Sequence, residues 1–150
     1  MLCNFSTVYP KGHPLAGQPT DFIEQITVTR RKKHTLRDSA ERWEKARERS
    51  ATPPMHIYTG ARTANAVRHG LELYKGCQRV DIWRTKNQTP GDMPAIVVDG
   101  RQLRLEEAAN FIANDGFYTP QAFEAWFFLG VPEEVLFVTK YCLHWTDLRY

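Results

Sequence analysis

Apolar and polar residues alternate over short stretches in the middle of the chain, a pattern typical of β-strands. Runs of this kind, bounded by glycine, proline or polar turns, predict strands at 55–60, 79–85 and 95–100. The Asp99–Gly100 pair predicts a tight hairpin after the third run. A longer apolar run at 135–145 predicts a closing strand.

A helical period replaces the alternation after Leu103. Four apolar residues are spaced i, i+3, i+4 and i+7, on one face of a helix that ends near Gly116: Leu105, Ala108, Ala109 and Ile112. Thr119 and Pro120 supply the N-cap and first-turn signals of a last helix. We expect this helix to end at Gly130 and to bury three aromatic residues: Phe123, Trp126 and Phe127.

Proline and glycine dominate the beginning of the chain. Residues 6–20 contain three prolines and two glycines, so we expect an arm or a loop over 1–20. Thr20 is placed to cap a short helix in which Phe22, Ile23 and Ile26 share a face.

A strongly polar helix is predicted over 39–49. Asp38 and Glu41 have the spacing of a capping box at its start, and Trp43 is its only large apolar residue. Two charge pairs have helical spacing: Glu41 with Lys45 and Glu44 with Arg47. Pro53 ends the helix because it disfavours helical geometry at the preceding residue.

Together these elements predict an α+β fold with about five short strands and separate helices. The close spacing of the strands favours a small β-barrel with flanking helices over a parallel sheet. With 150 residues, 42% of them hydrophobic and 25% charged, the chain is expected to form a single domain, 1–150, rather than a disordered or fibrous protein.

The formal net charge of +3 is too small to establish a polyanionic partner, but the cations concentrate between Arg30 and Arg49. The three cysteines contain no C-x-x-C pair, which favours a reducing compartment. No apolar run approaches the roughly 20 residues of a membrane span, and the N-terminus lacks the pattern of a signal peptide. We therefore expect a soluble, cytoplasmic protein without a membrane partner.

The segment RRKKHTLRDS, residues 30–39, carries the densest positive charge. Arg30 and Arg31 are interpreted either as solvated charges or as phosphate contacts. Lys33 and Arg37 lie near the start of a predicted helix, where anions bind favourably. Arg62, in a turn that lacks a phosphate-loop pattern, is another candidate contact for phosphate or a carboxylate.

Lys32 and Thr35 lie in the same segment and can act as a catalytic pair. An uncharged Lys accepts a hydroxyl proton, and the pKa of Lys falls on burial or among other cations. Thr35 is otherwise an ordinary β-branched strand residue. Asp115, in the sequence ANDGF, is either part of a helix-ending turn or a carboxylate that transfers a proton to a leaving amine.

The histidines offer no pattern of metal ligands. His56 and His144 lie on predicted strands and are interpreted as hydrogen-bonded structural residues. No spacing of His and Cys matches a known metal site, so we predict neither a metal nor a cofactor.

From about Phe22 to Tyr150 the chain resembles the ASCH domain, a PUA-like small β-barrel associated with RNA and nucleosides. The resemblance rests on the segments KKHTLRDS and NDGF, supported by FIEQI, HIYTG, FEAWF and the closing HWTDLRY. Some ASCH proteins are amidohydrolases that remove the acetyl group of acetylcytidine with a Lys, a Thr three residues later and a Glu. Lys32 and Thr35 match this K-x-x-T spacing, and Asp115 stands where the Glu is expected, one methylene shorter.

The resemblance implies RNA or a modified nucleoside as the partner. In an amidohydrolase, Lys32 would be the base, Thr35 the activated hydroxyl and Asp115 the acid, while Arg37 orients a carboxylate or phosphate. Two alternatives stay open: a non-catalytic module that binds single-stranded RNA through phosphate contacts and stacked bases, and an RNA-cleaving ASCH protein. The aromatic segment FEAWFF is better explained as core than as a docking site, and protein partners stay unknown.

Overall fold

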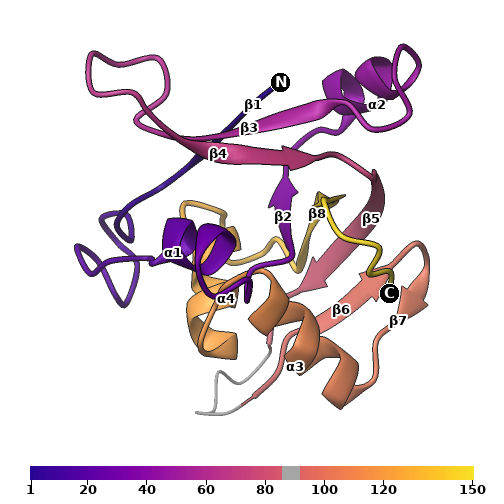
Figure 1. Cartoon of the computed structure of the whole chain (residues 1–150). Helices are drawn as coiled ribbons and strands as arrows, with labels where there is room; N and C mark the ends of the chain where they lie inside the picture. The colour runs from indigo at the N-terminus through magenta and orange to yellow at the C-terminus, as the bar shows by residue number, and fades with distance from the viewer. Residues whose placement is uncertain (86–91) are drawn as a thin grey trace.

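The computed structural model describes residues 1–85 and 92–150 (Figure 1). Four helices are assigned in these residues: α1 (Phe22–Thr27), α2 (Glu41–Arg47), α3 (Leu105–Asn114) and α4 (Pro120–Phe127). The strands are β1 (Leu2–Phe5), β2 (His34–Arg37), β3 (Pro54–Thr59), β4 (Val67–Leu73), β5 (Gly76–Trp83), β6 (Ala95–Val98), β7 (Arg101–Gln102) and β8 (Phe137–His144). The fold class is α+β, as the sequence predicts.

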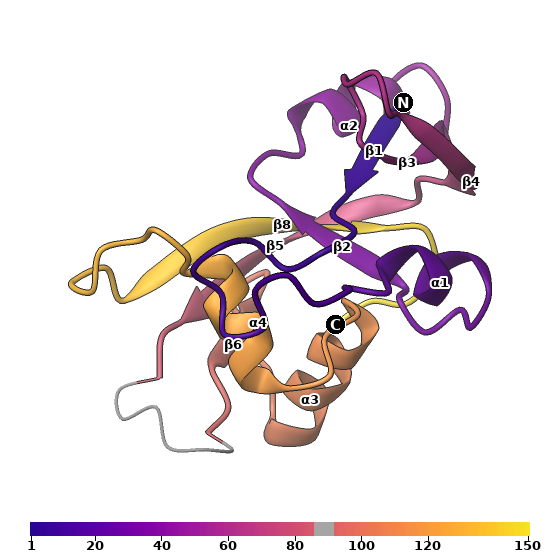
Figure 2. The same ribbon diagram turned by 90° about the vertical axis from the view of Figure 1, so that its left-hand side faces the viewer.

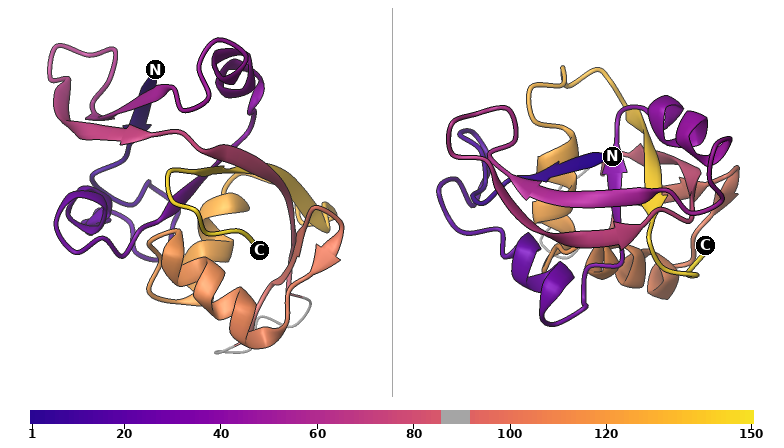
Figure 3. Two further views of the ribbon diagram at one scale, coloured as in Figure 1. Left: turned by 45° about the vertical axis from the view of Figure 1, so that its right-hand side comes forward. Right: turned by 45° about the horizontal axis from the view of Figure 1, so that its top comes forward.

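The strands form two sheets. Three strands pair in the order β1-β3-β4, with β1 parallel to β3, and five strands pair in the antiparallel order β2-β8-β5-β6-β7. Only Tyr74 and Lys75 separate β4 from β5, and Figure 3 shows the chain curving there from one sheet into the other. The pairing of the described strands leaves two sheets rather than one closed barrel.

The helices lie at two places around the sheets. Figure 2 shows α3 and α4 together beside the five-stranded sheet, with α1 near them, while α2 lies by the three-stranded sheet. Aromatic side chains connect these layers: Phe111 of α3 packs against Phe123 of α4 and against His34 of β2. The residues that precede β2 lie between α1 and the end of α3, because the N–H groups of Lys32 and Lys33 donate to the carbonyls of Gln25 and Asn114.

Several predicted elements are confirmed. The three central strands and the closing strand are present, and Asp99 and Gly100 form the β6–β7 turn with positive φ angles of 48° and 85°. Thr119 caps α4 by accepting a hydrogen bond from the Ala122 backbone N–H at 3.1 Å. The charge pairs of α2 also form, at 2.7 Å for Glu41 with Lys45 and 3.6 Å for Glu44 with Arg47.

The predicted helix caps at the beginning of the chain are wrong. Asp38 pairs with Lys140 of β8, so the capping box with Glu41 does not form, and the Ser39 hydroxyl accepts the Glu41 backbone N–H instead. Thr20 donates its hydroxyl hydrogen to the Ser6 carbonyl rather than capping α1. In both cases a side chain that could cap a helix instead bonds to a residue outside that helix: Asp38 to Lys140 and Thr20 to Ser6.

Two strands and one helix face also differ from the expectations. Strand β1 occupies the beginning of the segment predicted as an arm or loop, and β4 lies where no strand is predicted. Leu105 is 71% exposed and Ala109 is also exposed, and α3 instead buries Ala108, Phe111 and Ile112. Within residues 1–85 and 92–150, no helix has the length and apolar character needed to cross a membrane.

Candidate functional site

Lys32 and Asp115 form a buried ion pair between the segment that leads into β2 and the end of α3. The Lys32 Nζ donates to the Asp115 Oδ1 at 2.8 Å and also to the Asp115 backbone carbonyl. Both side chains are only 2% exposed. The structure therefore brings together two of the three residues that the sequence suggests for catalysis.

Backbone contacts fix the position of Lys32. Its N–H donates to the Gln25 carbonyl of α1 at 3.1 Å, and the N–H of Lys33 donates to the Asn114 carbonyl at 2.7 Å. Gly116, with a φ of 94°, lies directly over the Lys32 side chain: a Cβ there would be 3.1 Å from the Lys32 Cδ. The glycine of the NDGF turn thus permits both the left-handed backbone and the close approach of the lysine.

Burial opposes the charged state of both partners. It lowers the pKa of Lys32 and raises the pKa of Asp115, while the attraction between the two charges acts in the other direction on each. A backbone hydrogen bond from Leu36 and the positive charge of Arg37 also favour the ionised form of Asp115. Transfer of one proton along the 2.8 Å hydrogen bond would convert the ion pair into a neutral amine and a neutral acid.

Thr35 lies on β2, three residues after Lys32. Its backbone pairs with Leu143 of β8, and the residue is 3% exposed. Among the described residues, its hydroxyl makes no side-chain hydrogen bond, and none joins it to Lys32 or Asp115. The structure therefore does not join the Thr35 hydroxyl to the ion pair by a hydrogen bond within residues 1–85 and 92–150, although Thr35 follows Lys32 closely in the chain.

Arg37 shares a face of β2 with Thr35 because strand residues two apart point to the same side. Its Nη2 donates to the Asn4 carbonyl at 2.8 Å, and its guanidinium lies 5.0 Å from the centre of the Phe5 ring. The Lys32 Nζ approaches the same ring at 5.8 Å. Phe5 thus has both cations near it and connects the buried pair with Arg37.

Arg37 also reaches a surface pocket of about 450 Å³ at the start of α2. The pocket is lined by charged side chains, one hydroxyl and one aromatic ring: Arg37, Asp38, Ser39, Glu41, Arg42, Trp43 and Lys45. The guanidinium of Arg42 lies 4.9 Å from the centre of the Trp43 ring. The pocket therefore offers cations next to the strand that carries Thr35.

The other candidate binding residues are spread over the surface. Arg30 forms an ion pair with Glu72 of β4, and Lys33 is exposed. Arg31 donates to the Phe117 carbonyl at 3.2 Å and stacks on Tyr118, with 4.1 Å from its guanidinium carbon to the ring centre. Arg62 lies in the turn between β3 and β4, which belong to the other sheet, so the structure does not bring it together with Thr35.

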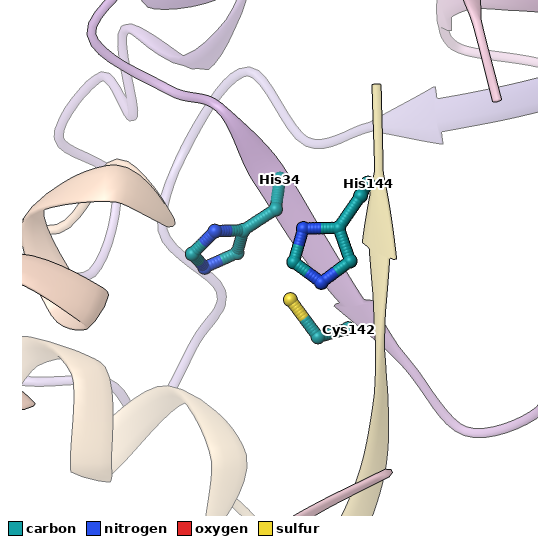
Figure 4. Close-up of side chains that lie close together, drawn as sticks. All are labelled: His34, Cys142 and His144. Atoms are coloured by element: carbon teal, nitrogen blue, oxygen red, sulfur yellow. The ribbon is translucent and has the colours of Figure 1, made fainter. Parts of the chain in front are cut away.

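A buried group of His34, Cys142 and His144 was missed by the sequence analysis (Figure 4). Within the described ranges, neither ring nitrogen of His144 has a hydrogen-bond partner, which differs from the expected structural role of this residue. Cys142 and His144 are two residues apart on the closing strand, so their side chains point to the same face. That spacing was the only indication of this group in the sequence pattern of the strand. Their partner His34 joins them only through the pairing of β2 with β8.

Comparisons of the chain with family models, with curated proteins and with solved structures find no match. The function is therefore inferred from the residues of the chain and from their geometry.

Proposed function

We propose that the chain is a nucleoside- or RNA-directed protein of the ASCH type that removes an acyl group from the amine of a modified cytidine. The observation that carries the proposal is the buried 2.8 Å contact between Lys32 and Asp115 at the beginning of the strand that holds Thr35. Buried charges with perturbed pKa values are a frequent property of catalytic sites. The proposal includes a small PUA-like barrel, and the passage of β4 into β5 between the two sheets supports it.

The proposed reaction begins with transfer of the Lys32 proton to Asp115. The neutral Lys32 amine then accepts the Thr35 hydroxyl proton while the Thr35 oxygen attacks the acyl carbon. As the bond between the acyl carbon and the amine nitrogen breaks, Asp115 donates its proton to the departing amine. Arg37 stabilises the negative charge that develops on the acyl oxygen.

Water completes the proposed cycle by attacking the acyl-threonine ester. Asp115, now ionised, accepts a proton from the water, and Lys32 returns its proton to the Thr35 oxygen. The products are the carboxylic acid and the free enzyme with a neutral Lys32 and a protonated Asp115. Each proton taken up by the pair is thus released within the cycle.

The proposed mechanism requires that the substrate reach Lys32, Thr35 and Asp115, whose side chains are only 2–3% exposed. Phe22 of α1 lies against Lys32, with 4.5 Å between the Nζ and the centre of its ring. We therefore expect α1 to move when a nucleoside enters. The shorter reach of Asp115, compared with the Glu of the resembling amidohydrolases, makes the position of the substrate amine critical, since errors of about 1 Å can slow a reaction about 100-fold.

A second candidate function, non-catalytic binding of single-stranded RNA, is favoured by the contact between Arg31 and Tyr118. Tyr118 is 58% exposed, and its ring has Arg31 stacked at 4.1 Å. An exposed aromatic ring beside cations is a typical platform for an unpaired base. Lys33 adds positive charge in the same segment.

The deciding experiment is chromatographic measurement of cytidine released from acetylcytidine by the purified protein. We expect release by the wild type, none by Lys32→Ala, and wild-type rates from Lys33→Ala, which removes the same charge at an exposed neighbouring position. Absence of release by the wild type at high protein concentration would sink the hydrolase proposal. Equal rates in Lys32→Ala would show that Lys32 is not the base.

A further inference from the structure

Three buried side chains that commonly bind transition metals lie together on β2 and β8. One ligand atom from each of His34, Cys142 and His144 lies within 4.8 Å of the others, and all three residues are 0% exposed. Figure 4 shows the Cys142 sulfur directed toward the space between the two imidazole rings. This group is separate from the residues used in the proposed hydrolysis.

Strand pairing explains how the three residues meet. His34 of β2 is directly opposite His144 of β8, and Cys142 lies two residues before His144 on the same face of that strand. The backbone hydrogen bonds between β2 and β8 therefore hold the three side chains in a fixed arrangement. Such rigid support favours a ligand site of defined geometry.

The imidazole nitrogens lack the partners that buried polar atoms normally have. Within the described part of the chain, neither the Nε2 of His34 nor either ring nitrogen of His144 forms a hydrogen bond. Buried polar atoms without partners are uncommon and call for a specific explanation such as a bound ion or water. Three such atoms beside a cysteine sulfur point to a ligand.

The remaining nitrogen of His34 has the environment expected of a metal ligand. Its Nδ1 lies 3.2 Å from the Tyr150 hydroxyl, which also accepts a hydrogen bond from the Asn114 side chain at 3.0 Å. When the Nε2 binds a metal, the Nδ1–H can donate to the Tyr150 oxygen, and a hydrogen bond of this kind orients most metal-bound histidines.

We propose that His34, Cys142 and His144 bind one zinc ion, which connects β2 to β8 inside the protein. Imidazole nitrogens and a cysteine sulfur are ligands that zinc prefers, and its bonds of about 2.0–2.3 Å require only a small inward movement of the three side chains. Zinc binding replaces the thiol proton of Cys142, which is released to solvent. Three protein ligands leave one position of a tetrahedral ion for water or another small ligand.

The test begins with protein purified under reducing conditions and treated with a chelator. Added zinc is expected to bind with 1:1 stoichiometry in calorimetry. It should also raise the midpoint of thermal unfolding by about 5–10 °C at a free concentration about 100 times the dissociation constant. Cobalt(II), an optical substitute for zinc, is expected to give a thiolate-to-metal charge-transfer band. A folded, reduced wild-type protein that shows neither zinc binding nor this band would overturn the proposal.

Variants assign the ligands. Cys142→Ser is expected to weaken zinc binding more than about 100-fold. Tyr150→Phe removes the hydroxyl that contacts the His34 Nδ1 and the Asn114 side chain, and it is expected to weaken zinc binding about 10–100-fold. The double variant Cys3→Ser with Cys77→Ser leaves Cys142 as the only thiol of the chain and is expected to retain the cobalt band. This variant keeps the test decisive if Cys142→Ser does not fold. Loss of the band in the folded double variant, or unchanged binding in Cys142→Ser, would contradict the assignment.

Discussion

The Lys32 ammonium lies 2.8 Å from the Asp115 carboxylate, although 83 positions separate the two residues in the sequence. Neither side chain has more than 2% of its surface in contact with solvent. Removing two charges from water costs several kcal/mol per ion, and their attraction often returns no more than that. The pair is therefore a weak source of stability, which is the property expected of a site kept for its chemistry.

The first prediction concerns the energetic cost of this pair. Lys32→Met leaves the buried Asp115 carboxyl without its ion-pair partner, so we expect the free energy of unfolding to fall by about 3–5 kcal/mol. The double variant Lys32→Met with Asp115→Leu removes both charges and is expected to have a stability near or above that of the wild type. Urea denaturation of the three proteins measures both effects.

The control for this comparison is Lys33→Met, in which the charge is removed from an exposed side chain. Its free energy of unfolding should stay within about 0.5 kcal/mol of the wild type. If the double variant loses as much stability as Lys32→Met does, the ion pair stabilises the fold, and a chemical role no longer follows from its energetics.

The second prediction concerns the hydroxyl of Thr35. Thr35→Val keeps the shape and removes the hydroxyl, and no side-chain hydrogen bond is lost among the described residues. We therefore expect a folded protein with unchanged thermal unfolding and no release of cytidine, whereas Thr35→Ser should retain measurable release. Release by Thr35→Val at the wild-type rate would exclude attack by the Thr35 oxygen.

The third prediction concerns Gly116, which lies over the Lys32 side chain. A Cβ at this position would be 3.0 Å from the Phe22 Cδ1 and 3.1 Å from the Lys32 Cδ. Gly100 has a similar φ, 85° compared with 94°, but nothing lies within 4 Å of its added Cβ. Both Ala variants pay the cost of a left-handed backbone, about 1–2 kcal/mol, and only Gly116→Ala also crowds its neighbours.

We expect Gly116→Ala to lower the free energy of unfolding by about 1–3 kcal/mol more than Gly100→Ala does. Urea denaturation of the two variants measures the difference. Equal losses would show that Phe22 and Lys32 move aside easily, and that α1 holds the ion pair less tightly than these distances indicate.

Local sequence patterns predicted those elements whose signals lie within a few residues. The hairpin at Asp99 and Gly100 needs two residues of left-handed backbone, and the α4 cap at Thr119 needs a hydroxyl three residues before the Ala122 N–H. Each of these signals involves only residues that are at most three positions apart in the sequence. These elements were therefore predicted correctly.

Contacts between distant segments decided what the sequence analysis missed. Asp38 has the right spacing for a cap, but the Lys140 ammonium competes for it. Strand β4 has Gly70 and several exposed residues, so its apolar pattern is weak, and pairing with β3 forms it. The meeting of His34 with Cys142 and His144 depends likewise on strand register, which short stretches of sequence do not specify.

The candidate site falls between these two cases. The spacing of Lys32 and Thr35 can be read from four residues, but the contact of Lys32 with Asp115 depends on α1 and α3 lying on either side of the segment before β2. The buried state of the pair follows from that packing and from Gly116. The sequence therefore identifies Lys32 and Asp115 as candidates, whereas the packing determines how burial perturbs their pKa values.

The fourth prediction concerns RNA binding by the surface around Arg31 and Tyr118. If an unpaired base stacks on the exposed ring, Tyr118→Ala should weaken binding of a single-stranded oligonucleotide by about 1–3 kcal/mol, with little change in the dependence on salt. Lys33→Ala should instead reduce the slope of log K against log salt concentration by about 0.7, because one phosphate contact is lost.

Fluorescence anisotropy at several salt concentrations separates these two effects. Arg101→Ala, which removes an exposed cation from β7, is the matched control and should leave the slope unchanged. A slope that falls equally in Lys33→Ala and Arg101→Ala would mean that RNA responds to the total charge of the protein rather than to this surface. Binding by the wild type that does not depend on salt would exclude phosphate contacts by the basic segment altogether.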